Sequence, residues 1–156
     1  METASLSNIK KELKVLSASQ LQEITVRLAK FKKENKELLS YLLFDAFNQQ
    51  AFIQNVKEEI DEQFKNLNRS SIYLAKKTIR KVLKTTKKYI RFSASKEIEI
   101  ELLIYFCMKM KKSGLRLNSS RVIMNIYINQ VRRIKQVLSM MHEDLQMDYE
   151  DSVNRL

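Results

Sequence analysis

The sequence predicts an all-α protein, a single irregular helical bundle or short α-solenoid of about seven helices. The composition supports this fold class, because the chain contains no proline and one glycine. These two residues most often form turns or interrupt helices. Apolar side chains also recur every three or four residues along most of the chain, which is the period of an amphipathic helix.

Length and composition predict one folded domain over residues 1–156. A chain of this length can bury a core without disulfides or metal ions. Hydrophobic residues make up 44% and charged residues 30%, which is typical of a globular protein and not of a disordered chain. We expect the last ten or so residues to fray at the end of the final helix.

Apolar stripes and capping residues predict the first four helices. A helix from about residue 7 to 16 precedes Ser17 and Ser19, and each serine is followed three residues on by a glutamine, as in a capping box. A second helix runs to about Lys33, and Asn35 can cap a short third one. The fourth helix has an apolar face made by Phe52, Val56, Ile60, Phe64 and Leu67.

Three more helices are predicted after a polar joint at residues 68–71. The fifth ends near Phe92, and the segment from Ser93 to Ser95 separates it from the sixth, which stops at Gly114. Residues 97–102 alternate in the period of a strand, but no second strand-like segment could pair with them, so we predict helix. The seventh helix begins near Ser119 or Ser120 and is long, with an apolar stripe that reaches Leu145.

Cysteine and histidine usage limits the possible chemistry. The single Cys107 excludes an internal disulfide, and together with the single His142 it supplies too few ligands for a structural zinc site. We predict no metal and no cofactor.

The N-terminus lacks the pattern of a signal peptide, and the longest apolar run, residues 102–108, is too short to cross a bilayer. We therefore expect a cytoplasmic protein without integral membrane association.

The net charge of +11 is concentrated in one predicted helix. Residues 1–68 contain ten basic and ten acidic residues, and residues 93–156 contain ten and eight. Residues 69–92 contain nine basic residues and no acid. At about 100° per residue, eight of the nine fall within an arc of about 140°. We call these eight the basic strip: Lys76, Lys77, Arg80, Lys81, Lys84, Lys87, Lys88 and Arg91.

The opposite arc of this helix is apolar and predicts the face that packs on the core. It is formed by Ala75, Ile79, Val82, Leu83, Thr86, Tyr89 and Ile90. Like charges one helical turn apart repel each other, so a strip without any carboxylate has a cost that an anionic partner would relieve. A basic face that is merely solvated is the alternative interpretation.

Three anionic partners could bind the basic strip. Nucleic acid suits the mixture of lysine and arginine, with Tyr73 on the same arc as a stacking group, although the sequence has no known recognition motif. A membrane surface would require the apolar face, which the core already needs. An acidic protein cannot be distinguished from nucleic acid by sequence. A second basic group could extend the strip: Lys109, Lys111, Lys112, Arg116, Arg121, Arg132, Arg133 and Lys135.

Catalytic motifs are absent from the sequence. His142 has acidic neighbours, but the positions one helical turn away hold no metal ligand, so we interpret it as a surface histidine. The carboxylates at 58, 59, 61 and 62 are interpreted as the solvated face of the fourth helix, and Cys107 as a buried apolar group. With one glycine, no phosphate loop, dinucleotide fingerprint or nucleophile elbow can be built. We predict that the protein is not an enzyme.

Five segments resemble a bacterial family of small helical proteins of unknown function: SLSNIKKELKVLSASQLQEI, RLAKFKKENKELLSYLL, FIQNVKEEIDEQF, IYLAKKTIRKVLK and HEDLQMDYED. The resemblance implies an all-α domain in a cytosolic bacterial protein and brings no activity with it. His142, Asp144 and Tyr149 match an HDxLxDxY-like ending of that family, whereas residues 116–140 depart from its pattern.

The leading hypothesis is a non-catalytic protein whose basic strip binds a polyanion, nucleic acid above all, through its phosphates. A helical scaffold or adaptor that binds an acidic partner protein is the second hypothesis. An enzyme centred on His142 is the third. The sequence does not indicate the oligomeric state.

Overall fold

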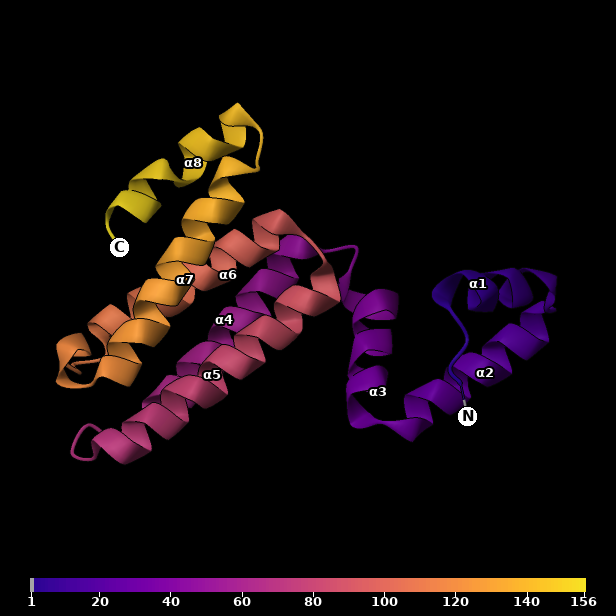
Figure 1. Cartoon of the computed structure of the whole chain (residues 1–156), viewed down its shortest axis with the longest axis horizontal. Coiled ribbons are helices and arrows are strands. Elements are labelled where there is room, and N and C mark those ends of the chain that lie inside the picture. Colours follow the sequence, from indigo (N-terminus) through magenta and orange to yellow (C-terminus); the bar gives the residue numbers. More distant parts are fainter. Residues whose placement is uncertain (1) are drawn as a thin grey trace. The chain divides into compact units, whose positions relative to one another are not determined.

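The computed structural model describes residues 2–156, and helices dominate the described part of the chain. Residues 2–156 form eight α-helices, α1 to α8, which follow one another along the sequence (Figure 1). The described residues form no strand. The predicted all-α fold class is therefore confirmed.

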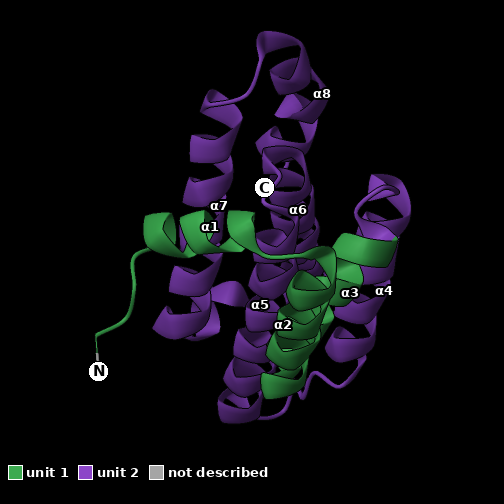
Figure 2. Cartoon of the chain, turned by 90° about the vertical axis from the view of Figure 1, so that its right-hand side faces the viewer, with its two compact units in different colours: residues 1–44 green, residues 45–156 purple. Residues whose placement is uncertain are grey.

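The chain divides into two compact units, residues 1–44 and residues 45–156, shown in green and purple in Figure 2. Each unit packs its own set of helices. The single domain that length and composition predict stays a prediction.

The first unit contains three helices, α1 (Leu6–Val15), α2 (Ala18–Phe31) and α3 (Lys33–Ser40), and a π-helical turn η1 (Tyr41–Asp45) follows α3. None of the three α-helices has a buried residue.

The capping box predicted at Ser17 is confirmed. Its hydroxyl accepts a hydrogen bond from the Gln20 N–H at 3.2 Å, and the Gln20 side chain accepts one from the Ser17 N–H at 2.9 Å. The cap predicted at Asn35 is wrong, because α3 begins two residues earlier, after the extended Lys32. The Asn35 amide donates instead to the Leu28 carbonyl oxygen at 2.9 Å and so ties α3 to α2.

The second unit contains the other five helices. They are α4 (Gln49–Lys65), α5 (Ile72–Ser93), α6 (Lys96–Lys112), α7 (Arg121–Ser139) and α8 (Glu143–Asn154), with a 3₁₀ turn η2 (Leu117–Ser119) before α7. Helices α4 and α5 form a hairpin, and α6 packs against α4, α5 and α7. Helix α8 packs back on α7 (Figure 1).

Helix α6 is apolar on nearly every side, and it lies at the centre of the second unit. Eight of its side chains are buried: Ile98, Ile100, Leu102, Leu103, Ile104, Phe106, Cys107 and Met110. The helix predicted for the alternating segment at 97–102 is confirmed. Alternation does not require a strand when a helix has neighbours on several sides, because every face of such a helix can bury apolar residues.

The single long helix predicted at the C-terminus is wrong. Helix α7 ends at Ser139 and α8 starts at Glu143, with His142 in an extended conformation between them. Residues 147–154 remain helical, contrary to the predicted fraying, because Val153 is buried and the Tyr127 hydroxyl donates to the Leu156 carbonyl oxygen. The apolar stripe hides the break, since Met141 in the connection is buried as well.

Two connections in the second unit use left-handed backbone. Gly114 has a φ of +80°, which confirms the predicted left-handed stop after α6, and Ala94 has a φ of +49° after α5. A Cβ atom on Gly114 would also lie 3.2 Å from the Arg69 Nε atom. An alanine in the left-handed region is strained, whereas glycine is not.

These two positions predict opposite effects of exchanging glycine and alanine. Gly114→Ala should lower the free energy of unfolding by about 1 kcal/mol or more, and Ala94→Gly should raise it by up to about 1 kcal/mol, because only glycine relieves the left-handed strain. Urea denaturation of the two variants and the parent would measure both changes. Effects of the same sign would contradict the assigned backbone conformations.

Candidate polyanion-binding face

Helix α5 carries the basic strip and is anchored by its opposite face. The Ser71 hydroxyl caps its N-terminus by accepting from the Leu74 N–H. The buried residues of the helix are Ala75, Ile79, Val82, Thr86 and Phe92. Leu83, Tyr89 and Ile90, also expected on the core face, are half-buried. The buried Thr86 hydroxyl donates to the Val82 carbonyl oxygen at 2.9 Å, so this polar group stays satisfied within the apolar face.

Contacts with α4 fix the rotation of α5 about its axis. The Tyr89 hydroxyl donates to a Glu59 carboxylate oxygen at 2.6 Å, and the Gln63 amide donates to the Thr85 hydroxyl at 3.2 Å. The rings of Phe52 and Tyr89 meet edge to face, with centroids 5.9 Å apart. Since α4 holds one side of α5 and α6 covers another, the basic strip is directed away from the packed faces.

The structure places the basic strip largely in solvent. Lys76 and Lys88 are half-buried, and the other six members are exposed. The Lys88 ammonium lies 4.6 Å from the centroid of the Tyr89 ring, a cation–π arrangement. Within residues 2–156, six members form no ion pair with a carboxylate: Lys76, Lys77, Arg80, Lys81, Lys84 and Lys87. Their charges are therefore not neutralised by the described part of the chain.

Part of the basic strip lines an open groove between α5 and α7, with a volume of about 660 Å³. From α5 come four basic side chains and one leucine, and from α7 come two asparagines and two aliphatic residues. The lining residues are Arg80, Leu83, Lys84, Lys87, Arg91, Val122, Asn125, Ile126 and Asn129. The sequence did not predict this groove, because periodicity assigns Val122 and Ile126 to a stripe without showing which helix they face.

Of the four acidic residues of α4, Glu58 and Glu62 are exposed as the sequence predicted, whereas Glu59 and Asp61 are half-buried and contact neighbouring helices. Lys57 Nζ lies 2.7 Å from a Glu101 carboxylate oxygen, and Lys109 Nζ lies 2.8 Å from Asp61. The Tyr105 hydroxyl also donates to Asp61 at 2.8 Å. These contacts join α4 to α6 across the partly buried surface between them, so they engage carboxylates in holding the bundle together.

The Asp61 cluster changes the pKa of its members. Burial by itself would raise the pKa of Asp61, but the hydrogen bonds from Lys109 and Tyr105 and the charge of Lys109 outweigh burial and lower it. Burial, followed by the hydrogen bond and the charge of Asp61, raises the pKa of Tyr105 to about 12. Tyr105 therefore remains a protonated donor, and Asp61 a charged acceptor, at neutral pH.

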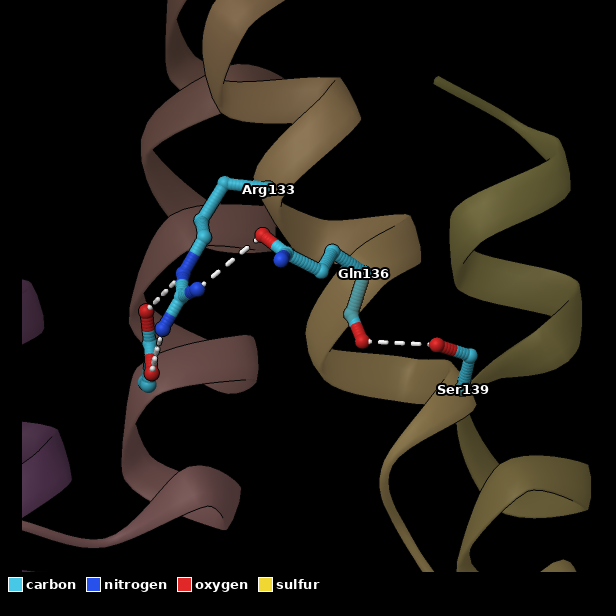
Figure 3. A network of polar contacts seen from close by, with 4 residues as sticks. Arg133, Gln136 and Ser139 are labelled. Atoms are coloured by element: carbon cyan, nitrogen blue, oxygen red, sulfur yellow. Dashed lines mark hydrogen bonds and ion pairs between the residues drawn. The ribbon is translucent and has the colours of Figure 1, made fainter.

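The second basic group does not add cations to the groove. Lys109 is paired with Asp61, and Lys111 donates to the Arg155 carbonyl oxygen at 2.7 Å. Arg133 binds Glu99 through two parallel bonds, with Nε at 2.6 Å and Nη2 at 3.1 Å from the carboxylate oxygens. Its Nη1 donates to the Gln136 side chain at 3.1 Å (Figure 3). The side chains that α7 contributes to the groove are all neutral.

His142 is the N-cap residue of α8. Its Nδ1 atom accepts from the Asp144 N–H at 3.4 Å and lies 3.4 Å from an Asp144 carboxylate oxygen, and both side chains are exposed. Within residues 2–156, no cluster of three or more histidine, cysteine or acidic side chains could hold a metal ion. Tyr149, which the resemblance groups with His142 and Asp144, is half-buried and donates to Glu101 at 3.5 Å. The arrangement around His142 is that of a helix terminus.

Cys107 is buried, as predicted. Burial raises the pKa of its thiol to about 12, so the reactive thiolate is not populated at neutral pH. A nucleophilic role for this residue has no support in the structure.

Comparisons with known proteins yield no relative. No family model, no curated protein and no solved structure matches the chain. The resemblance to a bacterial helical family therefore stays a prediction. Through residues 2–156, the helices are either too short or too polar to traverse a lipid bilayer.

The Asp61 cluster predicts a pH-dependent effect on stability. Asp61→Asn should lower the free energy of unfolding at pH 7 by about 1 kcal/mol, because the contacts it removes are partly exposed to solvent. The native pKa of Asp61 lies below its unfolded value of about 3.9. Its contribution is therefore fully present above that value and is lost as the pH falls through the lowered pKa.

Urea denaturation of the parent and the Asp61→Asn variant at pH 7 and at pH 3 would test this effect. The difference between the two proteins should shrink at the lower pH. Glu150→Gln, at an exposed site on α8, is the control and should change stability little at either pH. A difference of the same size at both pH values would contradict the assigned role of the Asp61 charge.

Proposed function

We propose that the protein is a non-catalytic binding protein that holds nucleic acid by its phosphates along the basic strip of α5. The observation that supports this most is the set of six lysines and arginines on one helix without a carboxylate partner in residues 2–156. The acidic residues Glu59, Asp61, Glu99 and Glu101 contact other side chains between the helices: Tyr89, Lys109, Arg133 and Lys57.

Phosphate binding is the role that best offsets the electrostatic cost of the strip. Like charges at i and i+4, such as those of Arg80 and Lys84 or of Lys77 and Lys81, repel each other. A polyanion removes this repulsion, and its condensed counterions are released into the solvent when lysine and arginine replace them. Because such contacts do not read base edges, the proposed binding through the strip has little sequence specificity.

Removing charge from the strip should weaken binding and flatten its salt dependence. Six phosphate contacts would lower the affinity about 10³-fold between about 50 and 200 mM salt. The triple variant Arg80→Gln, Lys81→Gln, Lys84→Gln should reduce the slope of log affinity against log salt by about 2 to 3, because each lost contact means that about one counterion fewer is released on binding. Fluorescence anisotropy with a labelled duplex across a salt series would measure both quantities.

The matched control removes three exposed basic residues outside the strip: Lys112→Gln, Arg116→Gln and Lys135→Gln. This variant has the same net charge as the strip variant, so any effect of total charge is common to both. The control should retain most of the affinity and of the salt slope. Equal losses in the two variants, or binding by the parent that does not depend on salt, would refute the proposal.

A role of His142 as a helix cap predicts that asparagine can replace it. Asn is among the strongest N-cap residues, so His142→Asn should keep or slightly raise the thermal midpoint of unfolding and leave nucleic-acid affinity unchanged. Circular dichroism and the anisotropy assay would measure these properties. A folded variant that loses binding or any activity found for the parent would instead favour a functional site centred on His142.

A further inference from the structure

The groove between α5 and α7 has an apolar floor and two polar rims of different character. Its half-buried lining residues are Leu83, Val122 and Ile126, so these lie deeper than the exposed side chains around them. The rim on α5 is cationic. The rim on α7 consists of Asn125 and Asn129, which are exposed and lie one helical turn apart.

The groove also divides the basic strip into two parts. Arg80, Lys84 and Lys87 line the groove, whereas Lys77 and Lys81 are equally exposed but do not. These three groove-lining cations follow α5 over about 10 Å, at 1.5 Å per residue between positions 80 and 87. Its cations succeed one another by roughly a turn, so they can follow a single phosphate backbone along the rim.

An apolar floor beside a cationic rim fits unpaired nucleobases better than a duplex. In a duplex the base faces are stacked inside, so the backbone could reach the cations while Leu83, Val122 and Ile126 stayed in water. Unpaired bases present flat apolar faces that can cover such side chains, while their phosphates follow the basic rim. Their edges then offer hydrogen-bond donors and acceptors to amides such as those of Asn125 and Asn129.

We infer that the groove is a binding site for single-stranded nucleic acid. The phosphates lie on the α5 rim, the nucleobases cover the apolar floor of the groove, and the edges of the nucleobases meet the two asparagines. This inference rests on the proposed function and adds to it a preference for unpaired strands. No aromatic side chain lines the groove. The planar guanidinium of Arg80 is therefore the group on which a nucleobase can stack.

An acidic amphipathic helix is the competing occupant, and the groove suits it less well. Such a helix places apolar anchors at several successive turns, whereas only three aliphatic side chains form the floor of this groove. It would also leave Asn125 and Asn129 opposite apolar or acidic side chains, where their amides gain fewer hydrogen bonds than at a base edge.

Affinity for matched single and double strands tests the inference. The full chain is titrated into a labelled twelve-nucleotide strand and into the duplex of the same length, at equal salt. We expect the single strand to bind at least about fivefold more tightly. The double variant Asn125→Ala, Asn129→Ala should weaken single-strand binding roughly tenfold through the loss of hydrogen bonds to bases. It should leave the duplex affinity and the salt slope unchanged.

A second pair of variants separates the groove from the rest of the strip. Arg80→Gln with Lys84→Gln should weaken single-strand binding at least about fivefold more than Lys77→Gln with Lys81→Gln, although both pairs remove two exposed charges. Thermal unfolding by circular dichroism confirms that each variant is folded. Equal effects of the two pairs would overturn the placement of the strand in the groove.

The outcomes distinguish the two levels of the proposal. Equal affinity for single and double strands, with no effect of the asparagine variant, would overturn the groove inference and leave phosphate binding by the strip standing. Absence of binding to either form at low salt would overturn both. Binding of an acidic amphipathic peptide, in a protein that ignores nucleic acid, would also overturn both and support the adaptor hypothesis.

Discussion

Burial of α6 is the constraint on which the second unit depends. Eight of its seventeen residues are buried, and they include positions on nearly every side of the helix. Such a helix can leave water only if neighbours cover several of its faces, and α4, α5 and α7 do so. The apolar faces of those three helices are consequently directed at one core. The outward direction of the cations on α5 follows from this packing together with the contacts that Tyr89 and Thr85 make with α4.

The distribution of acidic residues explains why one surface remains strongly cationic. Glu59 accepts the Tyr89 hydroxyl, Asp61 and Glu101 pair with lysines across the α4–α6 contact, and Glu99 binds Arg133. These four carboxylates therefore lie where helices meet, and a half-buried charge there needs a partner more than an exposed lysine does. Helix α5 has no acid of its own, and six of its cations form no ion pair with a carboxylate in residues 2–156.

Local signals allowed much of the fold to be predicted, and non-local contacts account for what was missed. Gly114 and the serine-rich joints act within a few residues, so the ends of α5 and α6 could be predicted from sequence. The break before α8 has no glycine or proline, and its cap is a histidine, which rarely serves as one. The buried Met141 continues the apolar stripe across that break. Because no glycine or proline marks this break, the sequence predicted one helix where the structure has two.

The candidate site divides in the same way. A helical wheel is sufficient to gather the basic strip, because all of its members belong to one helix with a well-defined apolar face. The groove requires knowledge of how α7 lies beside α5, and that arrangement is set by contacts with α6 that no periodicity encodes. Val122 and Ile126 look like ordinary core positions, and Asn125 and Asn129 like ordinary surface ones. Their position beside Arg80 and Lys84 is what could make the groove selective. Cations alone attract any polyanion, whereas an apolar floor and two amides beside the cations can discriminate among polyanions.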